Sequence, residues 1–100
     1  MEMQELSNKK ISNNESTYVK AHYLFFHCKD VSRNAIEQGN LSKAYFELIN
    51  SVNKFHEFMQ ASDINSTERN QMRAWYMNLV FERDELYMFA ENKNINLFEH

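Results

Sequence analysis

The sequence predicts an all-α protein, an antiparallel bundle of three long helices. Proline is absent and glycine occurs once, so the usual turn residues of β-rich or linker-rich chains are missing. Apolar residues make up 43% of the chain, which is too hydrophobic for a disordered protein. Three stretches repeat apolar residues at i, i+3, i+4 and i+7, the spacing of one helix face. A length of 100 residues allows one domain with one core.

The first helix is predicted at about residues 15–38. Residues 1–13 are polar and weakly patterned, and we expect a flexible N-terminal tail there, followed by the bundle over residues 14–92. Four residues offer possible caps for this helix: Asn13, Asn14, Ser16 and Thr17. Its predicted core stripe is Tyr18, Ala21, Leu24, Phe25, Cys28, Val31, Ser32, Ala35 and Ile36.

The second helix carries the most regular stripe in the chain. Gly39 suits the left-handed position that ends a helix, and Asn40 can cap the next one. Such a short connection predicts that the first two helices form an antiparallel hairpin. The second helix should end near Ala61. Its predicted core residues are Leu41, Ala44, Tyr45, Leu48, Val52, Phe55 and Met59.

The third helix is predicted at about residues 66–92. Asn65, followed three positions later by Glu68, resembles a capping box, with Ser66 or Thr67 as the alternative cap. Residues 93–100 form a C-terminal tail, whose apolar residues Ile95, Leu97 and Phe98 can fold back onto the end of the bundle. The core stripe of the third helix is predicted to contain Met72, Trp75, Tyr76, Leu79, Val80, Leu86, Tyr87 and Ala90.

Seven large apolar side chains point away from these stripes, at about 140–200° from the core direction of their helices. A three-helix bundle buries one broad face per helix, so we expect these side chains to be exposed on a single chain. A contiguous apolar patch indicates an interface, most simply that of a homodimer. The alternative is scatter, because single apolar side chains are common on protein surfaces. The predicted interface residues are Val19, Tyr23, Phe26, Phe46, Met77, Phe81 and Met88.

Arg83 is a charged residue inside the predicted core stripe of the third helix, between Leu79 and Leu86. One explanation is a partly buried ion pair across the bundle. The other is snorkelling, in which the aliphatic stem packs and the guanidinium reaches water. We expect snorkelling. The candidate partners for an ion pair are Asp30, Glu47 and Glu57.

Residues suited to metal binding or catalysis are few. His22 and His27 are five positions apart, about 140° around a helix, and cannot share a face; His56 lies on another helix. Cys28, the one cysteine, excludes an intrachain disulfide and falls in the core stripe, where a free cysteine acts as a small apolar residue. No glycine-rich phosphate loop, paired-carboxylate signature or nucleophile elbow is present. We therefore expect a non-enzymatic protein with no catalytic residues, no metal and no cofactor.

The net charge of −3 and the scattered lysines and arginines argue against non-specific binding to nucleic acid or anionic lipid. The N-terminus lacks the pattern of a signal peptide, and no apolar run reaches the roughly 18 residues that span a bilayer. We expect a cytoplasmic protein that does not contact membranes. The best candidates for reading DNA are Arg69, Asn70, Gln71 and Arg73 at the start of the third helix, beside Glu68.

These patterns favour a small regulator, adaptor, chaperone or inhibitor that acts by protein–protein binding through its apolar helix faces. Its partner would be another protein, with a second copy of the chain as the simplest case. The alternative is a transcriptional modulator that contacts DNA directly or through a DNA-binding partner. In either case the charged residues around the apolar anchors would set the choice of partner.

Overall fold

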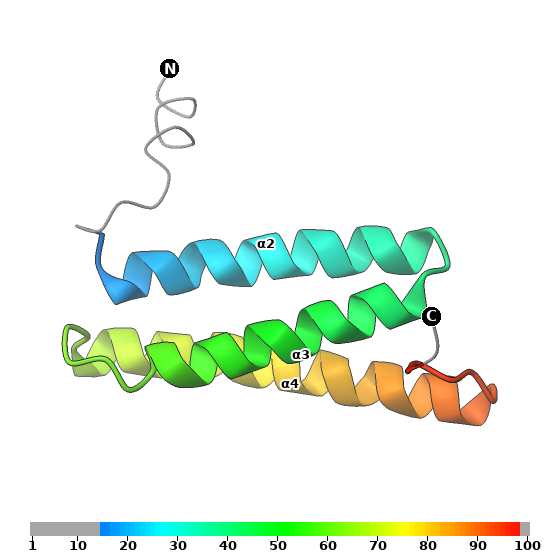
Figure 1. The fold of residues 1–100 in the computed structure, drawn as a ribbon. Helices are drawn as coiled ribbons and strands as arrows, with labels where there is room; N and C mark the ends of the chain where they lie inside the picture. The colour runs from blue at the N-terminus through cyan, green and yellow to red at the C-terminus, as the bar shows by residue number, and fades with distance from the viewer. Residues whose placement is uncertain (1–14, 99–100) are drawn as a thin grey trace, which may run out of the picture.

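The computed structural model describes residues 15–98, which form three helices packed against one another (Figure 1). Helix α2 spans Thr17–Glu37, α3 spans Leu41–Phe58 and α4 spans Ser66–Asn92. Over residues 15–98 there is no β-strand. The prediction of an all-α three-helix bundle is confirmed, with helix ends within three residues of those expected. The predicted tail at residues 1–13 lies outside the described residues.

Each helix begins at a side chain that accepts a backbone hydrogen bond from the first turn. Ser16, from the predicted set of caps, accepts the N–H three residues on at 3.2 Å, and Asn40 does the same at 3.1 Å. At the start of α4, Asn65 Oδ1 accepts the Glu68 N–H at 2.8 Å, while Glu68 Oε1 accepts the Asn65 N–H at 3.1 Å. The predicted capping box is therefore complete.

Two residues with positive φ turn the chain at the ends of helices. Gly39 has φ of 79°, the predicted left-handed position, and its N–H donates to the Ile36 carbonyl at 2.9 Å. Asn94 has φ of 59° just after α4, and the next N–H, that of Ile95, donates to the Ala90 carbonyl at 2.8 Å. Asparagine tolerates this conformation better than most residues that carry a Cβ atom. Both turns satisfy helix carbonyls that would otherwise lack a partner.

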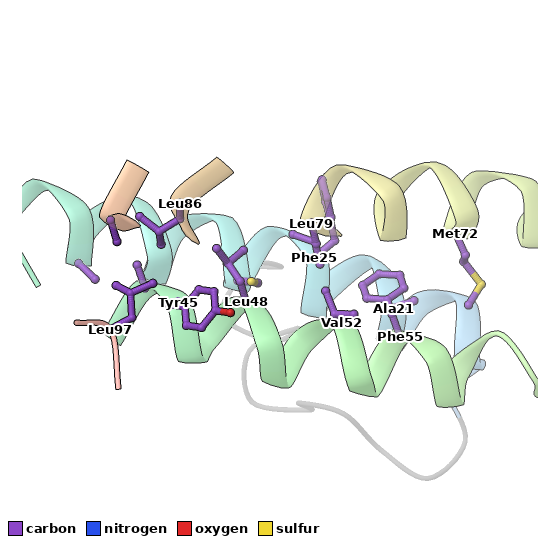
Figure 2. Packing of buried hydrophobic residues seen from close by; sticks show 14 of the residues in the cluster. Ala21, Phe25, Tyr45, Leu48, Val52, Phe55, Met72, Leu79, Leu86 and Leu97 are labelled. Carbon is purple, nitrogen blue, oxygen red and sulfur yellow. The ribbon is translucent and has the colours of Figure 1, made fainter. Parts of the chain in front are cut away.

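The core runs the length of the bundle and takes side chains from all three helices (Figure 2). In Figure 2, Met72 and Phe55 lie toward one end of the core, and Tyr45 and Leu97 lie toward the other. The polar residues in the core are Ser32 and Ser51. The buried apolar residues are Ala21, Phe25, Cys28, Ala35, Ala44, Tyr45, Leu48, Val52, Phe55, Ile64, Met72, Leu79, Leu86, Ala90 and Leu97.

The segment after α4 folds back onto the bundle, as expected from its apolar residues. Leu97 is buried, and the Phe98 ring lies 5.7 Å from the Tyr45 ring and 5.9 Å from the Phe46 ring. Ile95 remains exposed. This segment therefore covers the start of α3 at the end of the bundle where α4 finishes.

Two predicted core residues are exposed, and their assignment to the core was wrong. Ile36 is 45% exposed because it lies in the last turn of α2, on the wall of an open groove between α2 and α4. Tyr87 is 40% exposed because its ring lies at the rim of the α3–α4 contact, 6.1 Å from the Tyr45 ring. A hydrogen bond between its hydroxyl and Glu91 raises the pKa of Tyr87. In both cases the helical position is correct, but no neighbouring element covers the side chain.

The loop before α4 is tied to the other helices by two polar contacts. The Thr17 N–H donates to Asp63 Oδ2 at 2.9 Å, which joins this loop to the start of α2 and lowers the pKa of Asp63. The Arg69 guanidinium donates to the carbonyl of Met59 at the end of α3. These contacts hold the three helices together at the end of the bundle where α2 begins.

Candidate protein interface

The seven predicted interface residues differ in exposure. Val19 and Phe46 are half-buried. Phe46 lies near the start of α3, where the rings of Tyr45 and Phe98 contact it. The other five are exposed: Tyr23 (37%), Phe26 (51%), Met77 (40%), Phe81 (60%) and Met88 (63%). All five exposed residues lie on α2 and α4, so the candidate interface lies on these two helices.

Helices α2 and α4 lie side by side, with their residue numbers rising in the same direction. The Trp75 ring stacks 5.6 Å from the Phe25 ring. Farther along, the Lys29 ammonium pairs with Glu82 and donates to Asn78 Oδ1 at 2.8 Å. The Lys29 contacts place a residue of α2 level with residues 49 to 53 positions later on α4. This offset shows which side chains of the two helices lie at the same level along the bundle axis.

An open groove of about 640 Å³ runs between the two helices toward the end of α2. Its floor is mostly apolar: Leu48 reaches it from α3 and Leu86 from α4, beside the buried Ser32 of α2. Ile36 forms part of the α2 wall. The charged residues that line it are Lys29, Arg33 and Glu37 from α2 and Glu82 and Glu85 from α4. The groove thus has a mostly apolar floor and a charged rim.

Exposed apolar side chains of α2 flank this groove. The Phe26 ring lies 4.9 Å from the His22 ring, and the His22 ring lies 5.5 Å from Trp75 of α4. Phe26 therefore lies on the side of α2 that faces α4. Ile36 lies on the same side, because it lines the groove.

Exposed apolar side chains of α4 flank the groove from the other side. Phe81 follows Asn78 by three positions and precedes Glu85 by four, and both of these residues face α2. Residues three or four positions apart are neighbours on a helix surface, so Phe81 lies beside the groove. Met88 follows Phe81 by seven positions and lies on the same side of α4, and Phe89 follows Glu85 by four positions, on the side that faces α2. We use the name α2–α4 face for Phe26, Ile36, Phe81, Met88 and Phe89.

The sequence prediction named three of these five residues and missed two. Ile36 had been assigned to the core, and Phe89 had been assigned to neither the core nor the interface. The eight-residue spacing between Phe81 and Phe89 is a signal that could have identified Phe89. Tyr23 and Met77 lie farther around their helices, and Phe46 lies on α3, where the Phe98 ring contacts it. The assignment of all seven as interface residues stays a prediction.

Arg83 behaves as expected for a snorkelling residue. Its Nε and Nη2 atoms each lie 3.1 Å from Oδ1 of the neighbouring Asp84, at the surface, rather than from a carboxylate on another helix. The side chain is 32% exposed. Its aliphatic stem covers part of the core while the charge remains in contact with water.

Cys28 is fully buried, and its Sγ atom lies 3.9 Å from the Glu47 carbonyl oxygen. Burial raises the pKa of this thiol to about 11, so it stays protonated at neutral pH and is a poor nucleophile. Within residues 15–98, no three or more His, Cys, Asp or Glu side chains are grouped as a metal site would require. None of the three helices of this described region combines the length and apolarity needed to cross a membrane.

The candidate DNA-reading cluster is partly used for other contacts. Arg69 is bound to the Met59 carbonyl, and Glu68 completes the capping box. Asn70, Gln71 and Arg73 remain exposed on the first turns of α4. The cluster therefore offers one unengaged guanidinium, which is a small fraction of the phosphate contacts that specific DNA binding uses.

No protein-family model matches the chain, and searches of curated proteins and of solved structures return no significant match.

Proposed function

We propose that this protein is a non-enzymatic cytoplasmic regulator, adaptor, chaperone or inhibitor, an antiparallel bundle that binds proteins through its α2–α4 face. The observation that supports this function is the exposure of three large side chains on that face: Phe26, Phe81 and Met88 are each more than half exposed. Fully burying one such side chain contributes roughly 1.5–3 kcal/mol. A set of them on one surface therefore favours association with another protein.

The residue types on this face suit a protein interface. Phenylalanine and methionine cover large areas, and methionine adapts its shape to a partner. The charged groove rim, with Arg33 and Glu85 on opposite sides, would select among partners through charge. Phe26 and Phe81 are then the anchors, and the rim residues set specificity.

The test compares Phe81→Glu with Ile95→Glu. Both replace an exposed apolar side chain by a carboxylate, but Ile95 lies in the C-terminal segment, away from the α2–α4 face. Circular dichroism and thermal melting establish whether each variant folds. Tagged wild-type chain and each tagged variant are then used to capture bound proteins, including untagged copies of the chain, from cells that naturally produce the protein.

We expect both variants to fold, Phe81→Glu to lose the captured proteins and Ile95→Glu to retain them. An unfolded Phe81→Glu would mean that the residue belongs to the core, and an unchanged captured set would mean that the face is not the interface. The alternative function, a transcriptional modulator, predicts instead a salt-dependent mobility shift on duplex DNA that Arg73→Ala abolishes.

A further inference from the structure

We propose that the partner on the α2–α4 face is a second copy of this chain, related to the first by a two-fold axis parallel to the helices. Helix α2 of each copy then lies on α4 of the other. This inference rests on the proposed function and names the partner for that same face. It follows from the charges along the groove and from the heights of the residues that carry them.

The two edges of the groove carry opposite charges at the level of Arg33 and Glu85. Lys29 of α2 and Glu82 of α4 already pair with each other within one chain, which leaves Arg33, with Glu37 beyond it, on the α2 edge and Glu85 on the α4 edge. In a two-fold dimer each contact occurs twice, with the roles of the two chains exchanged. Placing α2 of each copy on α4 of the other therefore brings Arg33 of each copy toward Glu85 of the partner subunit, in both halves of the interface.

The same charges decide the direction of the axis. Two copies can face each other about an axis parallel to the helices or about an axis across them. An axis across the helices at the height of Arg33 and Glu85 would lay α2 on α2 and α4 on α4, so that each of these two residues would meet its own copy. Like charges placed against each other oppose association. The charge distribution therefore favours the axis parallel to the helices.

This axis also fixes which residues meet, because a rotation about it leaves every residue at its own height along the bundle. Residues of α2 stand level with residues 49 to 53 positions later on α4. Arg33 of one copy then meets Glu85 of the partner subunit, and Ile36 meets Phe89 of the partner subunit. One contact joins opposite charges, and the other joins apolar side chains.

Arg33 and Glu85 are available for such a contact. Arg33 lies 3.4 Å from Asp30 in an exposed pair within α2, which is worth little in water. Within the described residues, Glu85 makes no ion pair, although it lines the same groove as Arg33. Within one chain the two residues line the same groove but do not pair with each other, and the second copy supplies a partner to each.

The size of the face is adequate for a dimer. Two helices about 10 Å apart and about 30 Å long present roughly 600 Å² in plan, close to the roughly 800 Å² per partner of standard interfaces. In the dimer the two copies of α2 and α4 form a four-helix arrangement, and the groove between them is filled.

The experiment exchanges the two charges. Arg33→Glu puts two acidic residues together at both contacts of the dimer, and Glu85→Arg puts two basic residues together there. We expect each variant alone to dimerise at least about tenfold more weakly than the wild type, as measured by native mass spectrometry over a dilution series. An equimolar mixture of the two variants restores both contacts, and we expect a heterodimer with near wild-type affinity. The double variant Arg33→Glu/Glu85→Arg should form a homodimer again.

Each single variant carries two like charges at positions 33 and 85, so mixing the variants cannot restore a pair within one chain. A restored dimer in the mixture therefore requires that the two residues meet between chains. Two variants that dimerise like the wild type would overturn the proposal, and so would a mixture that forms no heterodimer. A monomeric wild type would also overturn it. In that case, loss of captured proteins by Phe81→Glu would still support the proposed function with a different partner.

Discussion

Helices α3 and α4 use their apolar residues differently. In α3, which has 18 residues, none of the large apolar side chains is exposed, because α2, α4 and the C-terminal segment cover them. In α4, which has 27 residues, five are exposed: Met77, Phe81, Tyr87, Met88 and Phe89. Within one chain, all the large apolar side chains of α3 are covered, whereas several of those of α4 are not. The comparison separates residues that stabilise the fold from residues available to a partner.

The largest difference in the free energy of unfolding should appear between the alanine variants of two phenylalanines. Phe55 of α3 is fully buried, whereas Phe81 of α4 is 60% exposed. Phe55→Ala should lower the free energy of unfolding by about 3–5 kcal/mol, because it removes apolar contacts and leaves a cavity. Phe81→Ala should change the stability of the monomer by about 0.5 kcal/mol or less. Urea denaturation at low protein concentration measures both, and equal losses would remove the distinction between the two helices.

The buried side of the bundle should also show a characteristic response to high pH. Burial raises the pKa of Cys28 from 9.0 to about 11, so between these values the folded chain holds a proton that the unfolded chain releases. The free energy of unfolding should therefore fall as pH rises from 9.0 to about 11, with the full contribution present below 9.0. Chemical denaturation across this range, with Cys28→Ala as the control, measures the effect. If the Cys28→Ala variant showed the same decline in the free energy of unfolding, titratable groups other than Cys28 would cause it.

The starts of α3 and α4 offer a smaller comparison. Asn65 shares a reciprocal capping box with Glu68, whereas Asn40 accepts a single backbone hydrogen bond. Each alanine variant loses one side-chain acceptor, since the backbone N–H of residue 65 still donates to Glu68. Asn65→Ala should cost about 1 kcal/mol and Asn40→Ala somewhat less, because the bond to Asn65 Oδ1 is 2.8 Å long and the bond to Asn40 Oδ1 is 3.1 Å long. Thermal melting of the two variants compares them. A larger loss for Asn40→Ala would show that its short connection to α2, and not the cap, dominates.

The smallest expected effect concerns Asp63, an exposed residue that accepts the Thr17 N–H. The lowered pKa of Asp63 means that its contribution to stability is present above 3.8 and is lost as pH falls through the lowered value. Asp63→Asn keeps an oxygen acceptor but cannot titrate. We expect this variant to lose stability less steeply in acid than the wild type, as followed by thermal melting against pH. Identical acid profiles would contradict the role of this contact.

Local sequence signals predicted the helices well. The cap at Asn40, the left-handed Gly39 and the box of Asn65 and Glu68 depend on neighbouring residues, and all three are found in the structure. The stripe of α3 was also correct, because a central helix is covered on a broad side. Local patterns could not predict that Ile36 stays exposed, since this depends on the open groove between α2 and α4.

The candidate interface was harder to predict for the same reason. Helical periodicity shows that Phe81 and Phe46 both point away from the core stripes, and it treats them alike. In the structure Phe46 contacts Phe98, which comes from a distant part of the sequence, whereas Phe81 is 60% exposed. Phe26 could be placed beside α4 only through the His22 and Trp75 rings. Contacts between segments that are distant in the sequence determine which apolar residues outside the core stripes remain exposed.

The most direct test of the difference between α3 and α4 is sedimentation equilibrium of the unmodified chain over a wide range of concentrations, beside Phe81→Glu. We predict that the mass of the wild type rises from 12.1 kDa toward twice that value as concentration increases. The folded variant should stay at the mass of one chain. A wild type that remains at 12.1 kDa throughout, or a variant that associates equally well, would contradict self-association through the α2–α4 face.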